Sequence, residues 1–454
     1  MVTIKKAIAS GIMIAMGVFA FLSCDVKYVG AFLFSLGLFC VCEYKLNLFT
    51  GMIGYAVENT KANGSKAILD LLKVLLFNII GIAGTCVFLS FTAGQDKTEK
   101  KLDMEITVEK CPSNADNRQA KISTILASGD KNIDLISVND EMISEFKHKG
   151  YLEPLEKNVM TEEVRDSFPQ KYLESICEEN GHIYSVPFQM DIMMFWVNQE
   201  LLKQAGLDEI KNTGDFDILQ KSLKNPDQYA YGDAWENTHV YNSLSQFVNF
   251  WGGDYFDWTD PKTKDAARYM KSMLDEKNTS PAQFVDQYEQ MEEKFIRGKY
   301  GCVFMYTSAL GTFLDADVYG KNKIHMAPLP VLHKKKATNI ATWQYVLNNA
   351  SQNKDAAVRF LQYAAGYEGS TEYAKIMKSY PARVDVIENE DIDLEGIDMI
   401  RKYLREYTLN ARPLCENSMG AVSDMGKLFQ GYVLGQCEED SFFEQAQNCI
   451  NTYY

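Results

Sequence analysis

The residues with the clearest potential for chemistry are aromatic and polar side chains in the later part of the chain. All five tryptophans and most of the 25 tyrosines lie beyond residue 190. Rigid aromatic rings bury a large surface at little entropic cost, and a few fixed polar groups then orient a bound molecule. This combination would suit a cleft that binds a small molecule.

Motifs for catalysis are absent from the sequence. It contains no GxSxG, HExxH, P-loop or GxGxxG pattern, and the five histidines share no metal-ligand spacing. None of the ten cysteines forms a CxxC pair, which argues against a zinc site. The acidic pair Asp315 and Asp317 has the composition of a glycosidase dyad, but a solvated turn explains it more simply. We predict a protein that is not an enzyme and needs no cofactor or metal.

The charge distribution separates two parts. The chain carries a formal net charge of −15, and the part beyond residue 95 supplies all of the negative excess. Nucleic-acid binding requires clustered basic residues, so we predict no nucleic-acid partner. The single basic run, at 334–336, is most simply a solvated turn.

The first 95 residues are rich in apolar stretches. Uncharged runs occupy residues 7–24, 28–42 and 74–92, and the second resumes at 46–57. Runs of this length predict three membrane-spanning helices in contact with lipid. The placement of lysines before the first run and between the second and third puts the N-terminus inside and everything beyond residue 95 outside. An alternative is a lipoprotein signal that ends at Cys24.

Beyond residue 97 the sequence alternates short strand patterns with helical ones. Residues 104–108 and 133–138 predict strands, whereas residues 120–127 and 141–149 predict helices. Gly150 follows a basic last turn, as a helix-ending glycine does. The alternation predicts a parallel sheet that is covered by helices on both faces.

The apolar part resembles the first half of the formate/nitrite transporter family. The most specific element is Leu48-Phe49-Thr50-Gly51, supported by Asn78 and Gly81. In that family this element interrupts the second helix, and the resemblance implies a pore-constriction role for Thr50. The later helices have no counterpart, so the predicted role is an anchor, and a channel is the alternative.

The later part resembles family 1 extracellular solute-binding proteins, the sugar-binding components of ABC importers, over residues 98–454. The resemblance depends on the order and spacing of several short segments, which are Ala127–Asp130, Gly150–Leu155, Tyr184–Phe188, Phe250–Asp254, Phe295–Lys299 and Tyr380–Arg383. The strand and helix that open the family's fold have no counterpart. The chain therefore looks like two incomplete family members joined near residues 92–101.

These resemblances imply three transmembrane helices followed by a two-lobed α/β domain of the type II periplasmic-binding-protein kind, with hinge crossovers. The expected boundaries are 1–95 for the membrane segment, 96–103 for a linker and 104–454 for the extracellular domain. The partners implied are a carbohydrate and the permease subunits and ATPase of an ABC importer. The alternatives are a formate/nitrite-type channel fragment that carries an extracellular domain, and a non-functional gene chimera.

The second resemblance also implies the ligand-binding residues, which are Asp191, Trp235, Tyr241, Trp251, Tyr306, Trp343 and Arg383. Core packing is an equal interpretation for Trp251, and an ion pair with Asp385 is the alternative for Arg383. We assign Trp196 to the core and Trp258 to a surface turn. A disulfide between Cys437 and Cys449 is left open.

Overall fold

The chain divides into two compact units, Met1–Val108 and Glu109–Tyr454. The structure is a computed structural model that describes residues 98–99, 101–111 and 115–454. The predicted membrane spans, the Thr50 loop and the alternative signal ending at Cys24 lie outside the described residues. Within the described ranges, no helix combines the length and the apolar character needed to cross a bilayer. The boundary at residue 104 stays a prediction.

The first predicted elements beyond residue 110 are confirmed. Helix α4 covers Ala115–Ser128, strand β1 covers Leu135–Asn139 and helix α5 covers Asp140–His148. Gly150 has a φ of 68°, the left-handed conformation that ends a helix at little steric cost. The strand predicted at 104–108 is wrong, because this segment forms no strand in the structure. An alternating pattern becomes a strand only where a partner strand accepts its hydrogen bonds.

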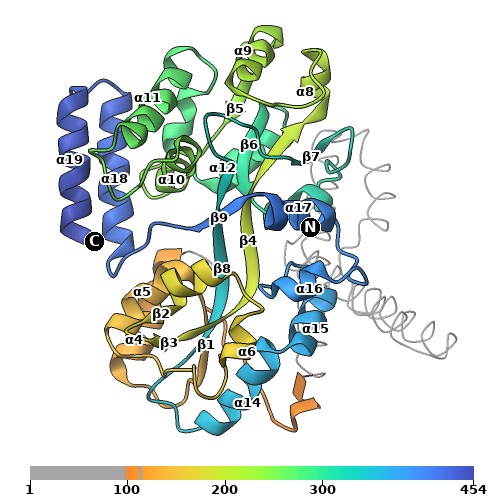
Figure 1. Cartoon of the computed structure of the whole chain (residues 1–454), viewed down its shortest axis with the longest axis vertical. Helices are drawn as coiled ribbons and strands as arrows, with labels where there is room; N and C mark the ends of the chain where they lie inside the picture. Colours follow the sequence, from red (N-terminus) through yellow and green to blue (C-terminus); the bar gives the residue numbers. More distant parts are fainter. Residues whose placement is uncertain (1–97, 100, 112–114) are drawn as a thin grey trace, which may run out of the picture. The chain divides into compact units, whose positions relative to one another are not determined.

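The unit Glu109–Tyr454 is built as two α/β lobes that share two long strands (Figure 1). The shared strands are β4 (Ser185–Asn198) and β8 (Ala337–Leu347). The first lobe also contains α4, β1, α5, α6 (Glu162–Arg165), α7 (Gln170–Tyr172), a π-helical turn (Leu173–Cys177), β2 (Glu178–Glu179), β3 (His182–Ile183), α14 (Lys354–Ala365), α15 (Tyr367–Met377) and α16 (Val384–Glu388).

The second lobe is formed by the segments between β4 and β8 and by the C-terminal helices. Its elements are α8 (Gln199–Gln204), α9 (Thr213–Ser222), β5 (Tyr229–Gly232), α10 (Val240–Trp251), α11 (Pro261–Asp275), a 3₁₀ turn (Pro281–Val285), α12 (Tyr288–Ile296), β6 (Tyr300–Tyr306), α13 (Ala309–Asp315), β7 (Ile324–Ala327), α18 (Ser418–Val433) and α19 (Glu439–Tyr453). Helix α17 (Ile397–Glu406) and strand β9 (Thr408–Ala411) lie on the path from the first lobe back to the second. The chain therefore crosses between the lobes in β4, in β8 and again before α18.

The sheet pairings show how β4 and β8 serve both lobes. The strand order is β1-β8-β4-β6-β5, with β7 beside β4 and β9 beside β8. Residues 185–192 of β4 pair with β8, whereas residues 193–198 pair with β6 and β7. Of the pairs in this sheet, only β5–β6 and β8–β9 are parallel. The prediction of a parallel sheet is therefore wrong, because a strand–helix alternation does not fix the direction of strands that pair across long sequence separations.

Local signals explain several helix ends in the second lobe. The side chain of Asp260 caps α11 by accepting a hydrogen bond from Lys262 N, and Pro261 occupies its first turn. Asn212 and Asp215 form a capping box at the start of α9. Gly252 ends α10 in the left-handed conformation, with a φ of 71°.

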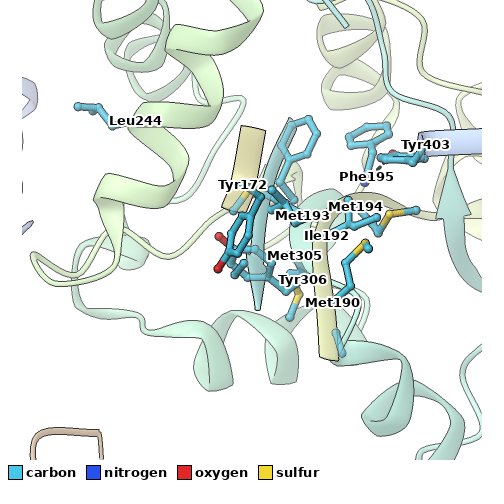
Figure 2. Close-up of a cluster of buried hydrophobic side chains, with 14 of the residues drawn as sticks. Tyr172, Met190, Ile192, Met193, Met194, Phe195, Leu244, Met305, Tyr306 and Tyr403 are labelled. Atoms are coloured by element: carbon cyan, nitrogen blue, oxygen red, sulfur yellow. Dashed lines mark hydrogen bonds between the residues drawn. The ribbon is translucent and has the colours of Figure 1, made fainter. Parts of the chain in front are cut away.

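The centre of β4 passes through the hydrophobic core. Figure 2 shows its residues Met193, Met194 and Phe195 near Met305 of the neighbouring strand β6. All residues from Met190 to Val197 are buried, and the Tyr403 hydroxyl accepts a hydrogen bond from Phe195 N at 3.0 Å. The part of this strand from Ile192 to Val197 is entirely apolar, as expected for a strand covered on both faces. This packing fixes the strand ends from which the side chains at the lobe junction project.

Candidate functional site

Side chains from both lobes meet in a group that we name the junction cluster, formed by Asp140, Glu141, Tyr241, Tyr306 and Arg412. Asp140 and Glu141 begin α5 in the first lobe. Tyr241 belongs to α10 and Tyr306 ends β6, both in the second lobe. Arg412 directly follows β9, on the segment that returns to the second lobe.

The guanidinium of Arg412 is the centre of the junction cluster. Its Nε donates to Asp140 Oδ2 at 3.3 Å and its Nη2 pairs with Asp140 Oδ1. Its Nη1 donates at 2.6 Å both to Glu141 Oε1 and to the Tyr241 hydroxyl. The Tyr241 hydroxyl in turn donates to Glu141 Oε1 at 2.6 Å. These bonds are charge-assisted, and they join residues of the two lobes.

Burial makes the charges of the cluster depend on one another. Asp140 is fully buried and Arg412 is 8% exposed. Burial acts to lower the pKa of Arg412, but Asp140 and Glu141 outweigh it and raise that pKa well above its ordinary value. Burial acts to raise the pKa of Glu141, yet Arg412 and the Tyr241 hydroxyl outweigh it and lower the net pKa. The carboxylate of Glu141 and the guanidinium of Arg412 are therefore both charged at neutral pH.

Two buried polar atoms beside the cluster have no hydrogen-bond partner within the described part of the chain, Asn139 Oδ1 and the Tyr288 hydroxyl. Asn139 uses its amide nitrogen to donate to Glu141 Oε2 at 2.8 Å, which leaves its oxygen unused. The Tyr288 ring lies edge-on to Tyr306, with 5.9 Å between the ring centroids. Unpartnered buried polar atoms are uncommon in native proteins, and a ligand or an ordered water can satisfy such an atom.

Four of the residues predicted from sequence lie in or near the junction cluster. Tyr241 and Tyr306 belong to it, and the Tyr306 hydroxyl donates to Asn242 Oδ1 at 2.9 Å. Trp343 is half-buried on β8 opposite Asn139 of β1, with the Arg118 guanidinium 5.3 Å from its ring centroid.

Asp191 is buried on β4 and faces the turn after β6. Its Oδ1 accepts hydrogen bonds from Thr307 Oγ1 at 2.7 Å and from Ser308 N at 2.9 Å. Burial raises the pKa of Asp191, and these two bonds oppose that effect. In this arrangement its carboxylate fixes the turn that follows Tyr306.

The other three predicted residues lie away from the cluster. Trp235 is fully buried edge-on to Phe284 and Phe429, inside the second lobe. Trp251 stacks on His333 with 5.0 Å between the ring centroids, in agreement with its core interpretation. We leave both tryptophans out of the proposed site, because neighbouring side chains already cover their rings.

Arg383 forms the ion pair with Asp385 that its alternative interpretation named. Its Nη2 lies 2.6 Å from Asp385 Oδ2, and its Nη1 donates to Ala365 O at 2.8 Å. These contacts hold the start of α16 in the first lobe, and Arg383 therefore also leaves the proposed site.

Two further predictions concern Trp258 and the cysteines. The surface position predicted for Trp258 is wrong, because it is fully buried against Phe442 and Phe443. Trp196 lies in the core as predicted, fully buried. Cys437 and Cys449 are free thiols in the structure.

Sequence reasoning missed Asn139, Asp140, Glu141, Tyr288 and Arg412. Asn139 ends strand β1, and Asp140 and Glu141 directly follow it, a place where side chains gather at a sheet edge, so a signal was present. Arg412 gave no local signal, because it is separated from Asp140 by 272 residues. Among the residues that the structure describes, no three histidine, cysteine or acidic side chains come together as a metal-binding group.

Solved structures share the fold of this chain. The maltose-bound MalE3 protein of T. maritima aligns with a TM-score of 0.67 and 16% identity, over 80% of this chain and 96% of that one. A solute-binding protein of Thermotoga lettingae bound with alpha-D-tagatose aligns with a TM-score of 0.69 and 18% identity, over 80% and 95%. At such identities the likeness shows the fold alone, here the two-lobed α/β fold of periplasmic binding proteins.

Curated proteins match at the sequence level over shorter segments. A probable amino-acid ABC transporter periplasmic-binding protein of Sinorhizobium fredii is 24% identical over 239 residues, 50% of this chain and 54% of that protein. A putative binding protein of Brucella abortus is 24% identical over 193 residues, 40% of this chain and 46% of that protein. The chain thus spans about half the length of these relatives. These matches do not show the formate/nitrite transporter half, which stays a prediction.

The sequence pattern of bacterial extracellular solute-binding proteins matches residues 93–371. This span is more than half of the chain, and it contains β4, β6 and β8 together with most of the junction cluster. The protein therefore belongs to the bacterial extracellular solute-binding protein family.

Proposed function

We propose that this protein captures a small neutral sugar or oligosaccharide outside the cell and delivers it to the permease subunits and ATPase of an ABC importer. The observation that carries the proposal is the pair of unpartnered polar atoms, Asn139 Oδ1 and the Tyr288 hydroxyl, beside the junction of the lobes. A sugar hydroxyl both donates and accepts, so sugar hydroxyls suit these two atoms.

The charge of the site favours a neutral solute. Arg412 is already paired with Asp140 and Glu141, which leaves the cluster without a free cation for an anionic ligand. The half-buried ring of Trp343 lies on the strand next to Asn139, with the Arg118 guanidinium over one of its faces, and we propose that its other face contacts the C–H groups of a sugar. Solute-binding proteins of the same fold have been solved with maltose and with tagatose.

We also propose that residues 1–95 anchor the binding domain, from residue 104 on, at the outer face of the cell membrane. The support is the sequence pattern of three apolar runs with lysines placed for an inside N-terminus. Alkaline carbonate extraction of membranes that carry the full chain tests this proposal. Release of the chain into the supernatant would contradict the anchor.

A ligand screen tests the binding function. The full chain in detergent is titrated with a panel of monosaccharides, oligosaccharides and sugar alcohols, and thermal unfolding and calorimetric heat are recorded. A ligand at about a hundred times its Kd should stabilise the fold by about 2.7 kcal/mol. Absence of both a thermal shift and heat across the panel would contradict the proposal.

Once a ligand is found, Tyr288→Phe tests the site. The lost hydroxyl has no partner among the residues that the structure describes, so the free energy of unfolding of the free protein should stay within about 0.5 kcal/mol. The Kd should rise about tenfold, because the ligand loses one buried hydrogen bond. Tyr432→Phe is the matched control, since its hydroxyl bonds to Glu439 between α18 and α19, and it should leave the Kd unchanged. An unchanged Kd in Tyr288→Phe would remove Tyr288 from the site.

A further inference from the structure

We propose that Arg412, Glu141 and Tyr241 act as a latch that holds the two lobes together in the absence of a solute. This inference goes beyond the capture of a solute, because it concerns the equilibrium between closed and open forms of the free protein. It depends on contacts between described residues and needs no identified ligand.

The three latch residues form a closed triangle of hydrogen bonds. Arg412 Nη1 donates to Glu141 Oε1 and to the Tyr241 hydroxyl, and that hydroxyl donates to Glu141 Oε1, each at 2.6 Å. Glu141 belongs to the first lobe and Tyr241 to the second, so one side of the triangle crosses directly from lobe to lobe.

Asp140 fixes Arg412 in its place within the latch. The remaining donors of the guanidinium, Nε and Nη2, both go to the Asp140 carboxylate, which is fully buried. The ring faces of Tyr241 and Tyr306 lie 5.9 Å from the guanidinium carbon and add cation–π attraction from the second lobe. Every charged group of the latch is therefore satisfied inside the protein.

A satisfied latch changes how a solute binds. A solute usually supplies the bonds that hold two lobes closed, but here the chain supplies them itself. The free protein is then mostly closed, and a solute that must enter between the lobes binds to the small open fraction. Its apparent affinity is reduced by that fraction, so weakening the latch should strengthen binding.

Tyr241→Phe is the variant that opens the latch without leaving a buried charge unpaired. It removes the direct bond from the second lobe to Glu141, whereas Arg412 keeps both carboxylates. Tyr432→Phe is the matched control, because Tyr432 is equally buried and also bonds to a glutamate, Glu439, but within the α18–α19 hairpin.

Hydrogen exchange of the full-length, solute-free protein measures the latch. We expect slow exchange in peptides that cover residues 140–148 and 240–251 of the wild type, and exchange about tenfold faster in Tyr241→Phe. Peptides from α14, away from the junction, should exchange alike in all variants and report an intact fold. Tyr432→Phe should match the wild type at the junction.

Equal exchange at the junction in Tyr241→Phe and wild type, with α14 unchanged, would overturn the latch. If Tyr241→Phe also speeds exchange in α14, Glu141→Gln becomes the deciding variant, because it keeps the shape and removes the charge. Faster junction exchange in Glu141→Gln with α14 intact would support the latch, and unchanged exchange would overturn it. No solute is present, so this result and the result of the sugar panel are independent.

Discussion

At the scale of the residue, the most informative side chain is Arg412. Its guanidinium is 8% exposed and is paired with a fully buried aspartate. It therefore forms hydrogen bonds with carboxylate oxygens in place of those that it would form with water. Such a pair gives little net stability over an apolar pair, but its disruption leaves a buried charge without compensation. The chain therefore depends on Arg412 far more than on its exposed arginines.

Replacement of Arg412 by methionine should lower the free energy of unfolding by about 3–5 kcal/mol, because Asp140 and Glu141 lose their partner inside the protein. Arg268→Met is the matched control, since Arg268 pairs with Asp265 and Glu439 at the surface, and should lose less than about 1 kcal/mol. Urea titration followed by tryptophan fluorescence measures both values. Equal losses would show that the buried pairing is not the cause.

At the scale of the element, helix α18 shows how a glycine permits close packing. A Cβ built on Gly426 would lie 1.9 Å from the backbone oxygen of Asn237, whereas one on Gly431 would meet nothing nearer than 4.0 Å. The close contact at Gly426 packs α18 against the loop that precedes α10. Helix α10 carries Tyr241. The same residue type therefore has two different roles on one helix.

The pair Gly426→Ala and Gly431→Ala separates these roles. Gly426→Ala should lower the free energy of unfolding by about 1–3 kcal/mol, because backbone must move to admit the methyl group. Gly431→Ala should raise it by up to about 1 kcal/mol, because alanine is the better helix former. Thermal unfolding of the two variants side by side gives the comparison. A stabilising Gly426→Ala would contradict the close approach.

At the scale of the whole binding unit, Glu109–Tyr454, the lobes are not independent bodies. Strands β4 and β8 each belong to both, and the buried hydrophobic residues form one connected cluster that includes Phe146 of the first lobe and Phe247 of the second. If one lobe unfolded, half of each shared strand would lose the strands that it pairs with. The fold itself therefore couples the stability of the two lobes.

We expect this unit to unfold in one cooperative step. Hydrogen exchange at rising denaturant should show α14 of the first lobe and α11 of the second losing protection at the same midpoint. The reason is that α14 packs on β4 and β8, whereas α11 packs on α10, which itself packs on β8, and all of them share one core. Two separated midpoints would show that the lobes unfold one after the other.

Local patterns in the sequence determined the elements near the site. The helix at Ala115–Ser128, the strand at Leu135–Asn139 and the helix at Asp140–His148 agree with predictions made from periodicity and turn residues. The resemblance to the family implied that Tyr241 and Tyr306 are ligand-binding residues. The position of Asp385, two residues after Arg383, predicted the ion pair that these two residues form. The predictions of these elements and of the Arg383–Asp385 ion pair succeeded because each depends on residues close in the chain. The ligand-binding role of Tyr241 and Tyr306 stays a prediction.

Only the tertiary structure decided which side chains face the junction and which face the core. Trp235 packs against Phe429 of α18, which lies almost two hundred residues further along the chain. No local sequence pattern predicts that contact. Arg412 reaches Asp140 across 272 residues for the same reason. Periodicity shows which face of a helix or strand is apolar. Packing between segments that are distant in the sequence decides which element covers that face. The same packing brings Arg412 to Asp140 and Glu141 between the lobes.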